Sequence, residues 1–242
     1  FIETRTEEGL TAVPDCELYR VFDMTYDYDI FPIWQRAVIG NIPVARYLDM
    51  LRFQNCIYPS NFIKMRCVEN HDQVRIMKLA PTEDQALAWT CFQAFNKGSF
   101  LIYAGQESAN THTPSLFEID KVDWGPYRLQ KLLTSLALLK KDPAQMNGRF
   151  TIISGDAPIE AVWYYPPASL YGVFNVTGLT GKIQVALPDG KYTNLLNGSA
   201  FKVINGTMNA PKFAAIARYN PVTPPRAYRV EMLSDPFWHR SE

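Results

Sequence analysis

The chain has 242 residues, of which 47 % are hydrophobic, and it carries 24 basic and 24 acidic residues. This length allows one or two domains, and the apolar fraction is sufficient for a buried core. The zero formal net charge gives no reason to expect nucleic acid as a partner, because nucleic-acid binders usually carry a basic patch or stripe. No apolar stretch approaches the ~18 residues of a membrane span, so no membrane partner is expected either. The chain begins at Phe1 without a methionine, and its localisation stays open.

The cysteines are Cys16, Cys56, Cys67 and Cys91. None of them forms a C-x-x-C pair, and the histidines do not lie near them at zinc-like spacing. We therefore predict reduced thiols in the core, with a disulfide as the less favoured alternative.

Strand-like and helix-like segments alternate in the first half of the chain. The segment 19–30 has a short apolar centre followed by acidic residues, and helical periodicity follows at 44–53. The segment 61–72 alternates like a strand and ends in polar residues. This order favours parallel β-α units, in an open sheet or a barrel.

The best-signalled helix is predicted from Thr82 to Phe95, because Thr82 and Gln85 have capping-box spacing. It is apolar over much of its surface, so it should be well buried. A buried strand is predicted at 99–105, and leucines at helical spacing predict a long helix at 126–141. Three strand candidates are too few to close a (β/α)8 barrel, which typically needs about 250 residues.

After residue 148 the pattern changes to short strand-like runs separated by turn residues. The turns contain Gly, Asn and Asp, which favours an antiparallel sheet or sandwich. The expected division is 1–147 for the β-α part, 148–220 for the all-β part and 221–242 for a Pro- and Arg-rich tail. The strand-like runs are FTII, AVWYY, LYGVFNV, KIQVAL, KYTNLL, FKVI and FAAIARY.

Polar side chains follow three of the predicted strands in the first part. In parallel α/β folds the working residues sit at the carboxyl ends of the strands. Carboxylates, an imidazole and amides are groups that bind sugar hydroxyls and stabilise a developing cationic sugar carbon. The three groups are Asp23, Asp27 and Asp29; then Glu69, Asn70, His71 and Asp72; and then Gly105, Gln106 and Glu107.

Each group also has a simpler explanation. Asn and Asp start turns, so the Asn-His-Asp triplet at 70–72 can be turn chemistry. Gly105 can serve a tight bend after a strand, and the three aspartates at 23–29 can form a solvated edge. A metal site built on His71 and Asp72 is supported by no second histidine and no H-E-x-x-H motif, so no metal is assigned.

Four segments in order resemble the α-amylase family (glycoside hydrolase family 13). CVENHD is similar to that family's seventh-strand motif, and GSFLIYAGQE to its eighth-strand motif, with LFEIDKVDW similar to the loop that follows. FDMTYDYDI precedes them in the order that the family has, and the all-β part matches its small antiparallel domain. The resemblance implies a fold: the C-terminal part of a (β/α)8 TIM barrel followed by an antiparallel β-sandwich domain.

The resemblance also implies an activity, the retaining cleavage or transfer of α-linked glucosyl units. By carry-over, Asp72 is the carboxylate that stabilises the transition state, and His71 binds sugar hydroxyls beside it. Asn70 shapes the loop, while Arg75 and Glu107 support the site. The implied partner is an α-glucan or oligosaccharide substrate, and no cofactor is implied.

The sequence departs from the family pattern at the two other carboxylates. The nucleophile motif, Gly-x-Arg-x-Asp, is absent, and none of Glu3, Glu7 and Glu8 is assigned as the acid/base. We therefore expect this chain to hold the last three barrel strands and to pack against the N-terminal part of the same barrel. Alone it should be inactive and should not persist as a free soluble domain, because a partial barrel exposes strand edges.

Two other functions compete with this prediction. One is a non-catalytic carbohydrate-binding or scaffold protein that keeps the amylase-like fold. The other is a binding module on the all-β part, with Trp163, Tyr164, Tyr165 and Tyr171 as an aromatic platform. Alternation along the strands places roughly half of these aromatics in the core.

Overall fold

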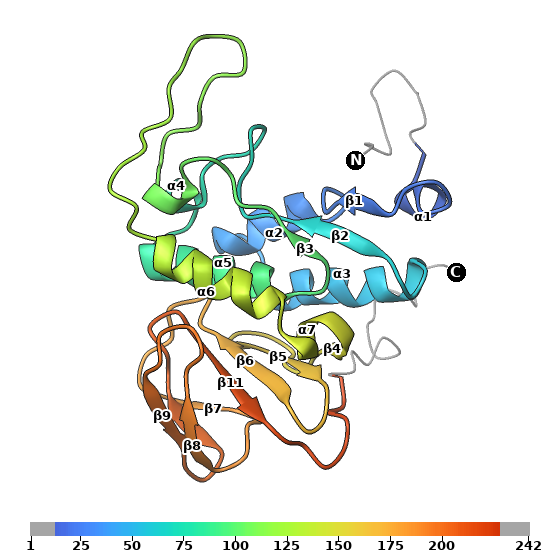
Figure 1. Ribbon diagram of the computed structural model, residues 1–242, viewed down its shortest axis with the longest axis vertical. Coiled ribbons are helices and arrows are strands. Elements are labelled where there is room, and N and C mark those ends of the chain that lie inside the picture. The colour runs from blue at the N-terminus through green and yellow to red at the C-terminus, as the bar shows by residue number, and fades with distance from the viewer. Residues whose placement is uncertain (1–12, 228–242) are drawn as a thin grey trace, which may run out of the picture.

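The computed structural model describes residues 13–227, and Figure 1 shows the arrangement of its helices and strands. Glu3, Glu7, Glu8 and most of the predicted tail lie outside the described residues. The β-α part contains α1 (Asp15–Leu18), β1 (Met24–Tyr26), α2 (Phe31–Val38), α3 (Val44–Ile57), β2 (Ile63–Arg66), α4 (Ile76–Leu79), α5 (Glu83–Phe95), β3 (Ser99–Phe100), the 3-10 turn η1 (Gln106–Ser108), α6 (Gln130–Lys140) and α7 (Pro143–Asn147).

The all-β part follows directly. Its strands are β4 (Arg149–Ile152), β5 (Ile159–Tyr164), β6 (Ser169–Phe174), β7 (Lys182–Gln184), β8 (Gly190–Thr193), β9 (Ala200–Val203), β10 (Thr207–Asn209) and β11 (Ala214–Tyr219). The fold is therefore mixed α/β, with a parallel sheet first and antiparallel sheets after it. Figure 1 shows α5 and α6 lying between these two regions.

The parallel sheet has the order β1-β2-β3, so its strands are neighbours in chain order. Tyr26 pairs with Met65, and Met65 pairs with Ser99. Parallel neighbours need a crossover, and here α2 and α3 provide the first crossover, while α4 and α5 provide the second. The carboxyl ends of the three strands consequently meet at one edge of the sheet.

One face of this sheet is covered and the other is only partly covered by the described residues. Thr25, Lys64 and Arg66 lie on the covered face and are buried, and the Arg66 Nη2 atom donates to Oε1 of Gln54 in α3 at 3.1 Å. Side chains alternate along strands, so Met24 and its register partner Ile63 point to the opposite face. Both of these are exposed large hydrophobic residues.

The predicted helix at 82–95 is confirmed as α5. The Thr82 hydroxyl accepts a hydrogen bond from the Gln85 N–H at 3.2 Å, which is the expected cap. Every residue from Ala86 to Phe95 is buried, as the apolar surface of the helix predicts.

A single hydrophobic core joins the β-α part to the first antiparallel sheet, which has the order β11-β6-β5-β4. The Phe174 ring of β6 lies 5.3 Å from the rings of both Phe92 and Phe95 in α5. The Trp163 Nε1 atom donates to the Phe95 carbonyl at 2.7 Å. A second, smaller core lies between this sheet and the two-stranded sheets β7-β10 and β8-β9.

Several predicted bounds and environments are wrong, each for an identifiable reason. The predicted strands at 61–72 and 99–105 shorten to β2 and β3, because pairing lasts only where a neighbouring strand runs alongside. Ile102 is 44 % exposed, since no described strand pairs with the outer edge of β3. The helix predicted at 126–141 begins only at Gln130, because the Leu129 N–H is bonded to the Glu107 carbonyl at 2.9 Å.

All four cysteines are free thiols in the structure, but only two of them are core residues. Cys67 and Cys91 are buried, and burial raises the pKa of the Cys67 thiol to about 12. Cys16 and Cys56 are exposed, so the prediction of four core thiols is wrong for these two.

Candidate functional site

The three strand ends do not contribute equally to the edge where they meet. Asp23 precedes β1 and is exposed, so it lies at the opposite end of the strand from the one predicted. Asp27 is buried and forms an ion pair with Arg66, while Asp29 forms an ion pair with Lys64 at 3.0 Å. The alternative of a solvated edge is therefore wrong for Asp27, which is buried, whereas Asp29 stays exposed although Lys64 of β2 holds its carboxylate.

The Asn-His-Asp triplet follows β2 and presents two of its side chains to solvent. The side chains of His71 and Asp72 are 53 % and 43 % exposed, and the His71 Nε2 atom lies 3.3 Å from Oδ2 of Asp72. Asn70 is buried, and its Oδ1 accepts the Asp72 N–H at 2.9 Å. This is the geometry of an Asx turn, so Asn70 shapes the loop that presents the other two residues.

Tyr28 adds a hydroxyl to this triplet, although the sequence reading did not single it out. Its hydroxyl accepts a hydrogen bond from Asn70 Nδ2 and lies 3.4 Å from Oδ2 of Asp72. Tyr28 follows β1, so two strand ends meet at Asp72. The only signal in the sequence was its place between Asp27 and Asp29 in the segment FDMTYDYDI.

Arg75 lies beneath the loop and is fully buried. Its Nη1 donates to Glu69 Oε1 at 2.7 Å, its Nη2 to the Ala104 carbonyl at 2.8 Å and its Nε to the His112 carbonyl at 2.9 Å. The guanidinium also stacks over the Tyr103 ring at 4.4 Å. Arg75 therefore fastens the loop after β2 to the loop after β3.

Glu107 belongs to the third strand end and sits in the η1 turn. Its Oε2 accepts the Gly105 N–H at 3.1 Å, and Gly105 has φ +90°, which confirms the tight bend predicted there. Glu107 lines a cavity of about 430 Å³ together with Tyr127, residues 102–104 of the segment that follows β3, and residues of α6. Gln106, by contrast, is buried.

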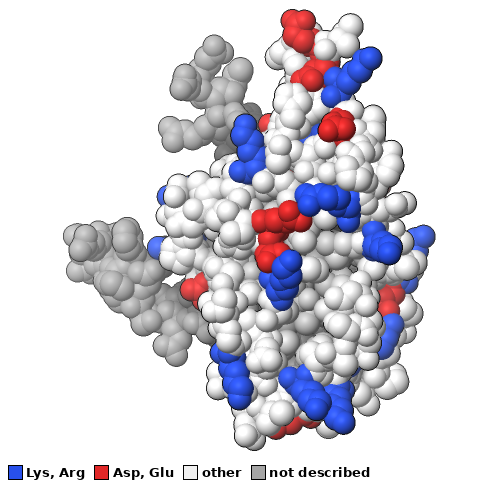
Figure 2. All heavy atoms as spheres, turned by 90° about the vertical axis from the view of Figure 1, so that its left-hand side faces the viewer, with Lys and Arg blue, Asp and Glu red and all other residues white. Residues whose placement is uncertain are grey.

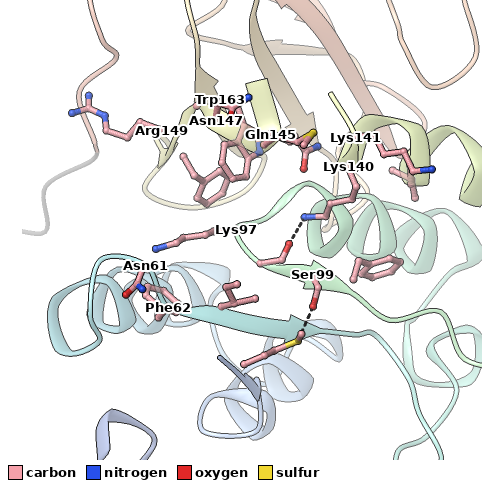
Figure 3. Close-up of a pocket in the computed structure, with 18 of the residues that line it drawn as sticks. Asn61, Phe62, Lys97, Ser99, Lys140, Lys141, Gln145, Asn147, Arg149 and Trp163 are labelled. Atoms are coloured by element: carbon pink, nitrogen blue, oxygen red, sulfur yellow. Dashed lines mark hydrogen bonds between the residues drawn. The ribbon is translucent and has the colours of Figure 1, made fainter. Parts of the chain in front are cut away.

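A larger cavity of about 1010 Å³ lies elsewhere in the molecule (Figure 3). Its lining includes Met24, Ile63 and Ser99, the first residues of the three parallel strands, so it is at the opposite end of the strands from Asp72. It also includes Lys97, Lys140, Lys141 and Arg149 and no carboxylate. Figure 3 shows Lys97 and Arg149 on one side and Lys141 on the other, so these cations do not converge on one point.

The aromatic platform considered for the all-β part is not formed. Trp163 and Tyr171 are buried, and Tyr164 and Tyr165 are half-buried, which agrees with the alternation along the strands. Figure 2 shows acidic side chains flanked by basic ones near the centre of one face, with other charged side chains scattered over it.

Two features are absent from residues 13–227, the part of the chain that the structure describes. No helix in this part is both long and apolar enough to cross a membrane. Within the same range, no group of three or more His, Cys, Asp or Glu side chains could hold a metal ion.

Comparisons with known proteins give a consistent result. The family model described as "Bacterial Alpha amylase C-terminal domain" matches residues 159–216. No curated protein sequence matches the chain. Among solved structures, an α-amylase from Lactobacillus plantarum is 30 % identical, with a TM-score of 0.79, over 88 % of this chain and 51 % of that one.

Two more distant structures share the fold. A noncanonic maltogenic α-amylase from Thermotoga neapolitana is 24 % identical, with a TM-score of 0.74, over 86 % of this chain and 53 % of its own. An α-amylase from Geobacillus thermoleovorans, complexed with acarbose, is 17 % identical, with a TM-score of 0.61, over 84 % of this chain and 49 % of its own. The chain thus spans about half the length of the solved structures that it matches.

The fold and the matches together describe a chain of mixed α/β architecture with a C-terminal antiparallel β region, similar to solved α-amylase structures. The resemblance to the α-amylase family is confirmed, and the chain corresponds to a C-terminal portion of such a protein.

Proposed function

We propose that the protein to which this chain belongs is a retaining α-amylase-type hydrolase or transglycosylase acting on α-glucosidic bonds. The observation that carries the proposal is the presentation of His71 and Asp72 to solvent at the carboxyl edge of the parallel strands. The buried Glu69–Arg75 pair beneath them supports a rigid loop, which a transition-state-binding carboxylate needs. The acarbose complex of the Geobacillus thermoleovorans α-amylase supports an α-linked oligosaccharide as substrate.

In this proposal Asp72 stabilises the positive charge that develops on the sugar ring. Cleavage with retention passes through an oxocarbenium-like state, and hydrogen bonds to sugar hydroxyls strengthen there. His71 binds hydroxyls in the same subsite, and Asn70 holds the backbone turn. Arg75 is buried with its guanidinium already hydrogen-bonded, which favours a supporting role for it over contact with substrate.

Glu107 also has a supporting role in the proposed site. Its carboxylate accepts the Gly105 N–H and faces the cavity of about 430 Å³, so we assign it to the walls of the site. A retaining enzyme needs two further groups, a nucleophile and an acid/base, with carboxyls roughly 5–5.5 Å apart. Both are assigned to the N-terminal part of the same barrel, which is the partner of this chain.

The open side of the parallel sheet supports that partner. The outer edge of β3 pairs with no described strand, and Met24 and Ile63 are exposed on the partly covered face. The cavity of about 1010 Å³ lies beside the same edge. Among the described residues, both polar side-chain atoms of Gln145, which lines this cavity, are buried without a hydrogen-bond partner. A strand and helix packed there would cover Met24, Ile63 and the outer edge of β3.

The proposed division of the chain follows from this. Residues 1–147 form the C-terminal portion of a (β/α)8 catalytic barrel, residues 148–220 an antiparallel β-sandwich domain and residues 221–242 a tail. No observation favours the alternative of a non-catalytic scaffold.

The test is Asp72→Asn in the full-length protein, assayed on maltooligosaccharides. We expect kcat to fall at least about a hundredfold, since loss of one electrostatic group at a transition state typically costs ~10²–10³. Asp23→Asn is the matched control, because Asp23 is exposed at the other end of β1. An unchanged kcat for Asp72→Asn would show that Asp72 has no catalytic role. The isolated 242-residue chain should show no turnover, because it supplies one of the required carboxylates.

A further inference from the structure

The hydroxyl of Tyr28 occupies a defined position between Asn70 and Asp72. Three hydrogen bonds connect the three residues: Asn70 Nδ2 to the Tyr28 hydroxyl, the Tyr28 hydroxyl to Asp72 Oδ2 at 3.4 Å, and the Asp72 N–H to Asn70 Oδ1 at 2.9 Å. Tyr28 is 44 residues away from Asp72 in the sequence, so the contact depends on the pairing of β1 with β2.

The direction of each hydrogen bond is fixed by chemistry. The Asp72 backbone N–H can only donate, so the oxygen of the Asn70 amide must face it, and the amide nitrogen must face Tyr28. That nitrogen can only donate, so the phenol oxygen accepts from it. The phenol proton can then be donated to the Asp72 carboxylate, which can only accept when ionised.

The position of the hydroxyl is set by packing. The Tyr28 ring stacks on Tyr26 with centroids 5.1 Å apart and meets the Phe31 ring edge-on at 5.6 Å. Phe31 is buried at the start of α2, so the ring has a fixed support. The phenol is protonated at neutral pH at the ordinary tyrosine pKa of 10.0, and burial raises the pKa of Tyr28 further.

We infer that Tyr28 is a positioning residue that orients the Asp72 carboxylate through its hydroxyl. This inference rests on the proposed function, in which Asp72 stabilises the transition state. The 3.4 Å separation is long for a hydrogen bond between oxygens, and such contacts tighten once substrate is bound. The Tyr28 hydroxyl should therefore affect kcat and contribute little to the binding of substrate in its ground state.

The variant Tyr28→Phe in the full-length protein keeps the ring and removes the hydroxyl. We expect kcat on maltooligosaccharides to fall about tenfold, the scale of one hydrogen bond to a charged group, while KM changes less than about twofold. Tyr26→Phe is the matched control, since its ring packs on Tyr28 and its hydroxyl forms no hydrogen bond with the described residues. It should leave kcat unchanged.

A double-mutant cycle separates positioning from a structural role. If Tyr28 acts through Asp72, Tyr28→Phe should have no further effect on kcat in the Asp72→Asn background. Equal losses in both backgrounds would overturn the inference, as would a kcat for Tyr28→Phe equal to that of the wild type. If Asp72→Asn itself keeps full activity, the proposed function fails, so the two failures are distinguishable.

A spectroscopic readout tests the geometry without turnover. The side-chain amide resonances of Asn70 should shift in Tyr28→Phe, because Nδ2 loses the Tyr28 hydroxyl and keeps only Cys67 Sγ at 3.8 Å as acceptor among the described residues, and they should not shift in Tyr26→Phe. Unchanged Asn70 resonances in Tyr28→Phe would contradict the hydrogen-bond arrangement and overturn the inference.

Discussion

Glu160 is a carboxyl placed between the antiparallel layers of the C-terminal part. It lies on β5, accepts the Ala186 N–H at 2.7 Å and is hydrogen-bonded to the Tyr171 hydroxyl. Burial raises the pKa of Glu160 above its ordinary value of 4.5, although both hydrogen bonds oppose the shift. The folded protein therefore holds this proton more tightly than the unfolded chain does, and ionisation of Glu160 costs stability.

The pH dependence of stability follows from this shift. The stability contributed by protonated Glu160 should be fully present below pH 4.5 and should be lost as the pH rises through the folded-state pKa of this carboxyl group. Glu160→Gln keeps an acceptor oxygen and removes the charge, so it should raise Tm at about pH 7.5 by roughly 2 °C or more and lose this advantage near about pH 4. Thermal unfolding at the two pH values measures this difference in Tm. Glu118→Gln is the control, because Glu118 is exposed. The same Tm difference at both pH values would contradict the assignment.

At the scale of elements, the loops after β2 and β3 are joined by buried contacts. Arg75 reaches the carbonyls of Ala104 and His112, and Gly105 makes the bend between them. A Cβ on Gly105 would lie 2.5 Å from Asn110 Nδ2 and 2.8 Å from Val122 Cγ1. The long loop that extends at the top of Figure 1 begins from this bend.

Gly105→Ala should therefore be costly for two reasons, its φ of +90° and the overlap of the new Cβ. Gly40→Ala is the matched control, because Gly40 has φ +75° with nothing within 4 Å of a Cβ. We expect the free energy of unfolding to fall by about 1 kcal/mol for Gly40→Ala and by at least about 1 kcal/mol more for Gly105→Ala. Denaturant titration of both variants measures the difference, and equal losses would show that the loop yields to the added methyl.

Helices and strands with strong local signals could be predicted from the sequence. The cap at Thr82 and the continuous apolar run of α5 are local properties, and so is the Asn-His-Asp turn. The network that holds Asp27 and Asp29 could not be predicted, because its cations, Lys64 and Arg66, come from another strand. Tyr28 was missed for the same reason: its importance depends on a pairing between strands that no spacing in the sequence reveals.

At the scale of the whole molecule, the predicted boundary near residue 148 does not divide the hydrophobic core. Trp163, Phe174 and Ile216 of the all-β part are buried in the same cluster as Phe92 and Phe95 of α5. The first antiparallel sheet uses one face to bury α5 and the other to bury the second core. Removal of the β-α part would expose the first of these faces to water.

We therefore expect the segment 148–220, produced alone, to lack a cooperative thermal transition and to bind a hydrophobic dye such as ANS. Burial of each large apolar side chain contributes about 1.5–3 kcal/mol, and the isolated segment would lose several such contributions. Calorimetry together with dye fluorescence measures this. A sharp transition without dye binding would show that the second core suffices.

The cationic lining of the cavity beside β3 has a consequence for self-association. An exposed strand edge can pair with the same edge of another molecule, and Lys residues at such an edge discourage this. Two copies meeting at this edge would bring the exposed Lys141 and Arg149 of each toward those of the other, with no carboxylate in the lining to offset the repulsion. Repulsion between exposed charges is screened by salt, so dissolved chains should form more oligomers as the sodium chloride concentration rises. Sedimentation velocity across a salt series measures this, and an oligomer content that does not change with salt would show that charge repulsion does not protect the edge.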